Sequence, residues 1–180
     1  MRRVVTGHDS KGRAVFVSDG EAPRYFANKA GGYGIGILWS TEETASIPVP
    51  PGDPSTSLQP YFPAAGGSRF LYVDFLPDSF AQDAARRGVD PVEATREFFE
   101  AFPGLGGTME EDAPGMHASM TIDYGFVVSG QVELELDDGV KKTLGPGDSV
   151  IQNGTRHRWY NPGADNCRVV FSVIGARRGR

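Results

Sequence analysis

The sequence predicts an all-β fold, a barrel or jelly roll, with a short α-helical insert. Three observations lead to this fold class. The chain contains 24 glycines and 13 prolines, spread along its length, which divide it into short segments separated by turns. The last third alternates apolar and polar residues, as strands do. A clear helix start occurs near the middle, where Asp90 precedes Pro91.

The first half predicts strands at residues 3–6, 14–18, 35–40 and 69–76. Residues 9–12 have the composition of a hairpin turn between the first two strands. Residues 47–67 are rich in proline, serine and glycine, so we expect a long loop over the surface or over a barrel mouth. Loops of this length are often functional.

The helical insert is expected over roughly residues 79–102. Asp78 or Ser79 can cap a first short helix that runs through Arg87. A second helix begins at Pro91 and ends before Pro103-Gly104. Its expected apolar stripe consists of Val92, Phe98, Phe99 and Phe102.

Short, evenly spaced strands are expected after Met109, as in a barrel or jelly roll. They lie at residues 131–136, 140–144, 149–152, 156–160 and 168–174. Residues 137–139 and 145–148 carry the turn residues between them. With 180 residues the chain is long enough for one domain, so we expect a single domain over 1–180.

Charge and cysteine content limit the classes of partner and site. Acidic residues outnumber basic ones by 23 to 18, and no basic stripe occurs, so nucleic acid is a poor candidate partner. No apolar run approaches a membrane span, so no membrane partner and a cytoplasmic location are expected. The single cysteine, Cys167, lies in an apolar run and is expected in the core.

Polar residues alternate along residues 117–123. Because alternate side chains of an extended segment share a face, His117, Ser119, Thr121 and Asp123 are expected to project together. Burial of Asp123 would require a charged partner or a metal. By the same parity His157, Trp159 and Asn161 share a face. His8 lies in the first turn region and is expected on the surface.

These residues resemble the two motifs of the cupin superfamily. His117-Ala118-Ser119, Asp123 and Gly130 follow the first motif, and Gly147-Asp148, Gly154, His157 and Asn161 follow the second. The resemblance implies a cupin-type jelly-roll β-barrel, with the motifs in residues 111–176 and N-terminal strands, a loop and the helical insert in residues 1–110. The motif match covers about the last third of the chain.

The chain departs from the motifs at two ligand positions. Metal-binding cupins use three histidines and a glutamate, whereas Ser119 replaces the second histidine here and Asp123 replaces the glutamate. The resemblance implies that His117, Asp123 and His157 could hold Fe, Mn or Zn with open positions. Alternatively no metal is bound, in which case Asp123 accepts a hydrogen bond from Ser119 or pairs with an arginine, and His157 is a hydrogen-bonded barrel residue.

The chain is similar to a subgroup of small cupins with serine or threonine at that position and an Asp-Tyr pair, here Asp123-Tyr124. The resemblance implies a metal-dependent oxygenase, or an isomerase- or cyclase-type tailoring enzyme, acting on a partly apolar or aromatic metabolite. His157 and Asp123 would be catalytic, and the expected substrate-binding residues are Ser119, Gln152, Trp159 and Tyr124. The alternative is a binding module that captures a small molecule without metal and without turnover. A homodimer is expected, because open sheet edges and an apolar helix stripe need cover.

Overall fold

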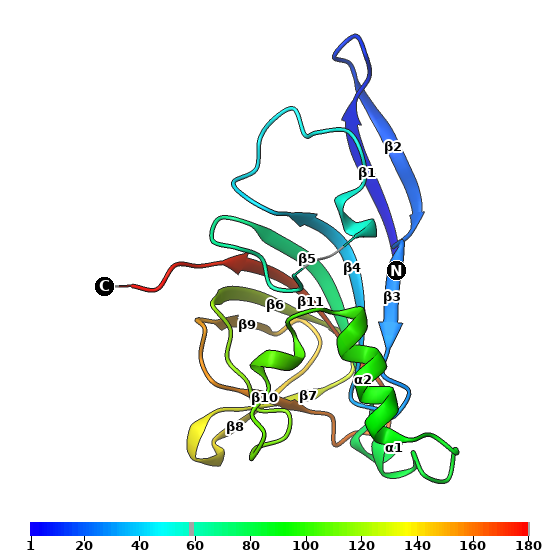
Figure 1. The fold of residues 1–180 in the computed structure, drawn as a ribbon, viewed down its shortest axis with the longest axis vertical. Helices are drawn as coiled ribbons and strands as arrows, with labels where there is room; N and C mark the ends of the chain where they lie inside the picture. The colour runs from blue at the N-terminus through cyan, green and yellow to red at the C-terminus, as the bar shows by residue number, and fades with distance from the viewer. Residues whose placement is uncertain (58–59, 180) are drawn as a thin grey trace.

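The computed structural model describes residues 1–57 and 60–179, in which two short α-helices accompany a mostly β fold (Figure 1). The strands are β1 (Arg2–His8), β2 (Ala14–Glu21), β3 (Arg24–Ala27), β4 (Tyr33–Thr41), β5 (Ser68–Phe75), β6 (Thr121–Ser129), β7 (Val132–Glu135), β8 (Lys141–Leu144), β9 (Ser149–Gln152), β10 (Arg158–Tyr160) and β11 (Cys167–Gly175). The helices are α1 (Asp78–Gln82) and α2 (Pro91–Ala101). The predicted fold class is confirmed.

A six-stranded antiparallel sheet forms the main wall of the molecule. Its strand order is β3-β4-β5-β11-β6-β9, so β11, the last strand of the chain, lies between β5 and β6. In β11 every second residue is buried, because the strand turns Val169, Phe171 and Val173 inward. Along β6 the same parity buries Thr121 and Asp123 and exposes Tyr124.

A three-stranded sheet, in the order β10-β7-β8, forms a second wall (Figure 1). Residues 137–139 turn the chain from β7 into β8, as predicted, and both Asp138 and Gly139 adopt positive φ values there, of 59° and 71°. The core lies between the walls. Trp159 of β10 packs edge-on against Phe171 of β11 and is tilted against Phe75 of β5.

The first two strands form a separate hairpin that projects from the rest of the molecule (Figure 1). Asp9 closes its turn, where the Asp9 carboxylate accepts hydrogen bonds from the backbone of Lys11 and Arg13. His8 is exposed at the end of β1, as predicted. Strand β3, which continues from the hairpin along the edge of the large sheet, was not predicted, because the sequence Arg24-Tyr25-Phe26-Ala27 does not alternate between apolar and polar residues.

The helical insert differs in detail from the prediction. Asp90 caps α2 as expected, since its carboxylate accepts hydrogen bonds from the backbone of Val92 and Glu93. The buried stripe is Ala94, Phe98 and Phe102, whereas Val92 is 79% exposed, so its predicted place in the stripe is wrong. It lies on the opposite side of α2 from these three residues, because two, six and ten positions along a helix correspond to rotations of about 200°, 240° and 280°.

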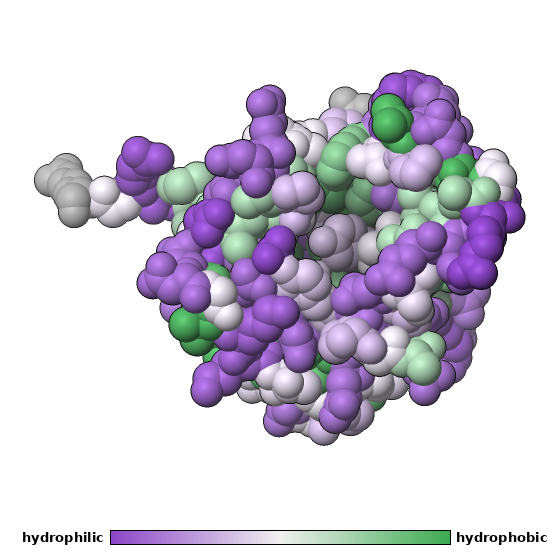
Figure 2. Space-filling model, turned by 90° about the horizontal axis from the view of Figure 1, so that it is seen from below, coloured by the Kyte–Doolittle hydropathy of each residue, from purple (hydrophilic) through white to green (hydrophobic). Residues whose placement is uncertain are grey.

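Helix α1 is shorter than predicted, ending at Gln82 rather than Arg87. Successive turns follow it, and the Arg87 guanidinium donates hydrogen bonds to the carbonyls of Lys29 and Phe80. These long-range bonds fix residues 83–88 as turns. Among the described residues, no helix is both long and apolar enough to cross a membrane. Viewed from below, a mostly hydrophilic surface surrounds a hollow in which hydrophobic side chains are visible (Figure 2).

Candidate functional site

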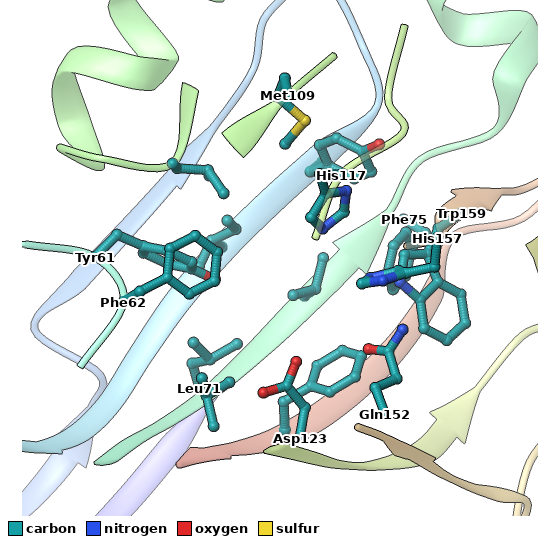
Figure 3. Close-up of a pocket in the computed structure, with 16 residues that line it drawn as sticks. Tyr61, Phe62, Leu71, Phe75, Met109, His117, Asp123, Gln152, His157 and Trp159 are labelled. Atoms are coloured by element: carbon teal, nitrogen blue, oxygen red, sulfur yellow. The ribbon is translucent and has the colours of Figure 1, made fainter. Parts of the chain in front are cut away.

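A pocket opens between the two walls, and most of its lining is aromatic or aliphatic. Strands β4, β5 and β11 supply one side, and residues 61–62, 105 and 109 close the other. Four polar side chains interrupt this apolar surface: His117, Asp123, Gln152 and His157 (Figure 3). The apolar lining comprises Tyr33, Ile35, Tyr61, Phe62, Leu71, Val73, Phe75, Leu105, Met109, Trp159, Phe171 and Val173. A mostly apolar cavity with few polar groups is the usual form of a small-molecule site.

His117 and His157 lie side by side at one end of the pocket (Figure 3). Each backbone N–H donates to the other's carbonyl, at 2.9 Å in both directions, which makes the two residues directly opposite partners in an isolated bridge. The ring centroids are 4.3 Å apart. The distant segments that carry the histidines are therefore joined at the site itself.

Backbone carbonyls fix the orientation of both rings. His117 Nδ1 lies 3.0 Å from the Gly115 carbonyl, and His157 Nδ1 lies 2.8 Å from the Thr155 carbonyl. Because a carbonyl can only accept, each Nδ1 carries the proton, and each neutral ring keeps an unprotonated Nε2. Burial lowers the pKa of both imidazoles, that of His157 to about 4, with His117 as the second cause. Both rings are neutral at physiological pH.

Asp123 and Gln152 face each other on neighbouring strands, as register partners of β6 and β9. Asp123 is 8% exposed and Gln152 is 4% exposed. Asp123 Oδ1 and Gln152 Nε2 are buried and have no hydrogen-bond partner within the described part of the chain. A buried polar atom without a partner is costly, so the pocket holds an acceptor and a donor that are free to bind a ligand.

Burial also changes the charge of Asp123. It raises the pKa of this carboxyl to about 6, because the charged form loses water and gains no cation. Both the acid and the carboxylate are then accessible near neutral pH. A group with this property can donate or accept a proton in a reaction.

Comparison with known proteins finds a family match for the segment that carries the polar pocket residues. Residues 107–173, which include all four polar pocket residues, match the cupin domain family. These residues are similar to the domain of that family. The predicted resemblance is confirmed at this level, and the fold is a mostly β cupin fold with two short helices.

Several relatives of this cupin domain come from fungi. Oryzines biosynthesis cluster protein J of Aspergillus oryzae is 43% identical over 65 residues, which cover 36% of each chain. A cupin-domain-containing oxidoreductase of Aspergillus ruber is 28% identical over 166 residues, or 88% of this chain and 63% of the relative. Another from Neurospora crassa is 25% identical over 177 residues, or 96% and 72%. The match therefore spans 36% of the length of the Aspergillus oryzae protein and 63% of that of the Aspergillus ruber protein.

Among solved structures, KdgF from a Halomonas species is similar over 86% of this chain and 87% of its own, with a TM-score of 0.43 and 16% sequence identity.

The pocket brings together five of the predicted site residues: His117, Asp123, Gln152, His157 and Trp159. Two other predicted site residues lie elsewhere. Ser119 is hydrogen-bonded to the Thr121 hydroxyl at 2.6 Å and is not part of the pocket lining. Tyr124 is 51% exposed on the opposite face of β6 from Asp123.

Ser119 projects to the same side as Thr121, as parity predicted, because their hydroxyls are 2.6 Å apart, yet it does not line the pocket. Strand β6 begins at Thr121, and a bend at Met120 separates it from the bridge at His117. Ser119 therefore lies outside the regular strand that presents Asp123 to the pocket. A hydrogen bond from Ser119 to Asp123, one of the alternatives for a site without metal, does not form in the structure, where Ser119 bonds to the Thr121 hydroxyl and Asp123 Oδ1 has no partner among the described residues.

Asn161 of the second motif has a structural role. Its side-chain N–H groups donate to the carbonyls of Phe75 and Asp165, at 2.8 Å each, and its amide oxygen accepts from the backbone of Gly163. Cys167 is fully buried in the core, as predicted, and burial raises the pKa of its thiol to about 11. Neither residue contributes a reactive group to the pocket.

Sequence reasoning did not single out the individual residues that close the pocket from outside the motifs. Tyr61 and Phe62 lie within the long loop (Figure 3), and Leu105 and Met109 follow α2. The loop was expected over a barrel mouth, but nothing in its composition singles out Tyr61 and Phe62. The only sequence signal is that two aromatic residues interrupt a stretch of proline, serine and glycine.

A fully buried arginine holds Tyr61 and its neighbour in place. Arg69 on β5 is 0% exposed, and its guanidinium donates to the carbonyls of Thr41, Pro60 and Tyr61. It also forms an ion pair with Glu42 at 2.9 Å. A fourth bond goes to the carbonyl of the adjacent Ser68. Because these carbonyls come from separate segments and converge on one planar cation, the pocket wall at Tyr61 is anchored to the large sheet.

The donor chemistry of the pocket fits a first-row divalent metal in part. The two unprotonated Nε2 atoms, each on a ring whose Nδ1–H is held by a carbonyl, are what an imidazole ligand pair requires. Asp123 supplies a free carboxylate oxygen from another side of the pocket. Within residues 1–57 and 60–179, however, no three His, Cys, Asp or Glu side chains are already close enough together to hold an ion.

Proposed function

We propose that this cupin domain is a tailoring enzyme that acts on a small, partly apolar or aromatic metabolite bound in the pocket. The observation that supports this most directly is the pair of buried, unpartnered atoms of Asp123 and Gln152 beside two neutral imidazoles. Such groups weaken a fold unless a ligand uses them. The aromatic walls favour a flat, apolar ligand body.

Each polar residue has a distinct part in this proposal. Asp123 holds or moves a proton at its free Oδ1, since its pKa of about 6 lies close to physiological pH. Gln152 Nε2 donates a hydrogen bond that orients an oxygen of the ligand. Trp159 packs against the ligand body, while the Nε2 atoms of His117 and His157 accept hydrogen bonds or bind a metal.

His117, His157 and Asp123 would together hold an Fe, Mn or Zn ion, with Asp123 approaching the histidines. Such an ion supplies Lewis-acid polarisation or access to dioxygen when bound. Metal content measured on protein purified without chelator tests this part. We expect bound metal that is lost in His157→Ala and retained in His8→Ala, which removes an exposed histidine on β1.

The names of the relatives agree with an enzymatic role of the oxidoreductase type. Those from Aspergillus ruber and Neurospora crassa are called cupin-domain-containing oxidoreductases, and one from Aspergillus oryzae is named for a biosynthesis cluster. We extend the general class, tailoring of a metabolite, to this chain. A cytoplasmic location and a lack of affinity for nucleic acid or membranes remain predictions.

Solvent exchange tests the proton-transfer step without knowledge of the product. A panel of small aromatic metabolites is first screened for quenching of tryptophan fluorescence, because Trp159 lines the pocket. Each binder is then incubated with metal-free and metal-loaded protein in D2O and analysed by mass spectrometry. We expect carbon-bound deuterium or a new product with the wild type and neither with Asp123→Asn.

A different result would support the alternative of a non-catalytic binding module. In that case binders would be recovered unchanged and without deuterium from both forms of the protein. Glu111→Gln, which neutralises an exposed carboxylate, is the matched control and should behave as the wild type. Equal exchange in the Asp123→Asn variant would show that another group moves the proton.

A further inference from the structure

Three pocket side chains form a row that crosses three separate segments of the chain. Met109 is the antiparallel bridge partner of His117, and His117 is in turn the bridge partner of His157. Direct partners on antiparallel segments project their side chains to the same face. All three residues accordingly line the pocket, and Figure 3 shows Met109 next to His117.

The two pairs in this row differ in spacing. His117 and His157 exchange both backbone hydrogen bonds, so they form the wider type of antiparallel pair. These bonds use the backbone N–H and carbonyl of His117, so its pair with Met109 is of the narrower type without direct hydrogen bonds. Next to that pair, the Glu110 N–H donates to the Met116 carbonyl at 2.9 Å. The backbone therefore brings the side chain of Met109 close to the His117 imidazole.

The row contains three uncharged atoms that can each give an electron pair to a metal. The Nε2 atoms of both imidazoles are unprotonated, because each Nδ1–H is bonded to a backbone carbonyl. The Met109 sulfur has no hydrogen to donate, and its unbranched side chain can rotate to turn the sulfur toward the two nitrogens. Within residues 1–57 and 60–179, no His, Cys, Asp or Glu side chain completes a group of three with this histidine pair.

The chemical softness of these ligands selects the ion that would bind. A thioether is a soft ligand that favours Cu(I), and imidazole also suits copper. Cu(I) has a filled d shell and is stable at low coordination number. Its single charge costs less to bury in a mostly apolar pocket than the double charge of Fe(II), Mn(II) or Zn(II), because the cost of removing an ion from water rises steeply with its charge.

We propose that Met109, His117 and His157 form a binding site for Cu(I), with the thioether sulfur and the two Nε2 atoms as ligands. The inference shares the histidine pair with the proposed function, but it does not use the Asp123 carboxylate. Asp123 lies on β6 opposite Gln152, so the two possible third ligands, a hard oxygen and a soft sulfur, come from different segments.

The other sulfur atoms of the chain are not positioned for this role. Met116 and Cys167 are buried and are not part of the pocket lining, Met120 is 50% exposed, and Met1 directly precedes β1. These residues therefore provide controls for a thioether ligand at Met109.

Competition with bicinchoninate under anaerobic, reducing conditions tests the site. Protein is titrated into the coloured Cu(I)–bicinchoninate complex, and the loss of absorbance gives the affinity for Cu(I). We expect equimolar uptake by the wild type and none by His157→Ala. Binding by Met109→Leu should be weaker by more than about tenfold, since even the loss of an outer-shell partner commonly costs a metal site about tenfold. Leucine and methionine have similar volumes, so this variant should fold.

Two further measurements show whether the sulfur itself is the ligand. The Zn(II) affinity of Met109→Leu, measured with a zinc indicator, should differ from that of the wild type by less than about twofold, because a thioether contributes little to a harder ion. X-ray absorption at the copper edge should show a sulfur neighbour in the wild type and in Cys167→Ala but none in Met109→Leu. Met120→Leu is the matched control and should bind Cu(I) as the wild type does.

Asp123→Asn separates this site from the proposed function. The variant should retain Cu(I) although it loses the deuterium exchange expected above, and loss of Cu(I) would assign the third ligand to Asp123 instead of Met109. A wild type that takes up no Cu(I), unchanged Cu(I) affinity in Met109→Leu, a sulfur neighbour that persists in that variant, or equal losses of Cu(I) and Zn(II) there would each overturn the proposal.

Discussion

Asp123 and Gln152 are direct register partners on β6 and β9, and each presents a buried polar atom to the pocket without a partner among the described residues. One atom accepts and the other donates, yet they do not bond to each other. The free protein therefore carries an unfavourable free energy that a ligand with a matching donor and acceptor would relieve. The predictions below follow from this cost and from the groups around it.

Replacing Asp123 by Asn should stabilise the metal-free protein at neutral pH. Burial raises the pKa of Asp123 from 3.8 to about 6, so between these values the folded state binds more protons than the unfolded chain. The stability contributed by this carboxyl is present below pH 4 and is lost as pH rises to 6. We expect Asp123→Asn to gain up to about 3 kcal/mol relative to wild type at pH 7.5 and little at pH 4.

Urea denaturation at the two pH values measures this difference. Glu111→Gln, at an exposed position, should show no comparable gain. If Asp123→Asn were less stable than wild type at pH 7.5, the carboxylate would have a stabilising partner in the folded protein.

His157 should affect the pH dependence of stability in the opposite direction to Asp123, and replacing it by Gln should remove that effect. Burial, with His117 second, lowers the pKa of His157 from 6.5 to about 4, so in that window the unfolded chain binds more protons. This residue contributes stability above pH 6.5 that is lost as pH falls to 4. In the wild type, the loss of stability from Asp123 and the gain from His157 oppose each other as pH rises from 4 to 6. In His157→Gln, only the pH dependence that is due to Asp123 should remain.

Denaturation curves of His157→Gln from pH 4 to 7 are the measurement. Stability should fall more steeply with rising pH in the variant than in the wild type. Parallel curves would mean that His157 titrates alike in the folded and unfolded states. His8→Gln, which changes an exposed histidine, serves as the control.

Replacing Gln152 by Leu should separate stability from binding. The variant removes a buried donor that lacks a partner in the described chain, so the free protein should gain about 1 kcal/mol. Affinity for polar aromatic ligands should fall about tenfold, because the hydrogen bond to the ligand is lost. Tryptophan fluorescence titration reports binding, and thermal denaturation reports stability. A variant that bound such ligands unchanged would exclude Gln152 from recognition.

Replacing Arg69 by Met should destabilise the fold and weaken ligand binding together. The variant leaves the carbonyls of Thr41, Pro60 and Tyr61 without their donor, so we expect a loss of about 3 kcal/mol or more. Arg69→Lys keeps the charge but not the planar geometry and should recover only part of the loss. Arg86→Met removes an exposed ion pair with Asp83 and should cost less than about 1 kcal/mol. Equal effects at the two positions would contradict the proposed anchoring role.

The sequence was informative where local pattern decides the structure. Alternation placed β7, β9 and β11 nearly to the residue, and Asp90 predicted the start of α2. The motif residues His117 and His157 meet as the resemblance implied. Position relative to other segments was not predictable. Which side of α2 faces the sheet, and so leaves Val92 exposed, depends on packing between segments that are distant in the chain. Ser119 bonds to nearby Thr121 instead of lining the pocket.

The same limit explains why the pocket wall was not predicted residue by residue. Tyr61 lines the pocket through its carbonyl bond to Arg69, a contact that no local period reveals. Tyr124 was expected at the substrate, yet strand parity within β6 directs it opposite to Asp123. The motif resemblance suggested which residues belong to the site, whereas strand parity decides which of them point into the pocket.

The guanidinium of Arg69 divides the long loop into two parts with different freedom to vary. It fixes one flank at Thr41 and Glu42 and the other at Pro60 and Tyr61. Residues 43–52 lie between these fixed points and are mostly exposed. Because the entropic cost of closing a loop rises only slowly with the number of its residues, this stretch can be lengthened with little change at the pocket. It is therefore a suitable place to insert an affinity tag or a fluorescent label, or for related chains to differ in length.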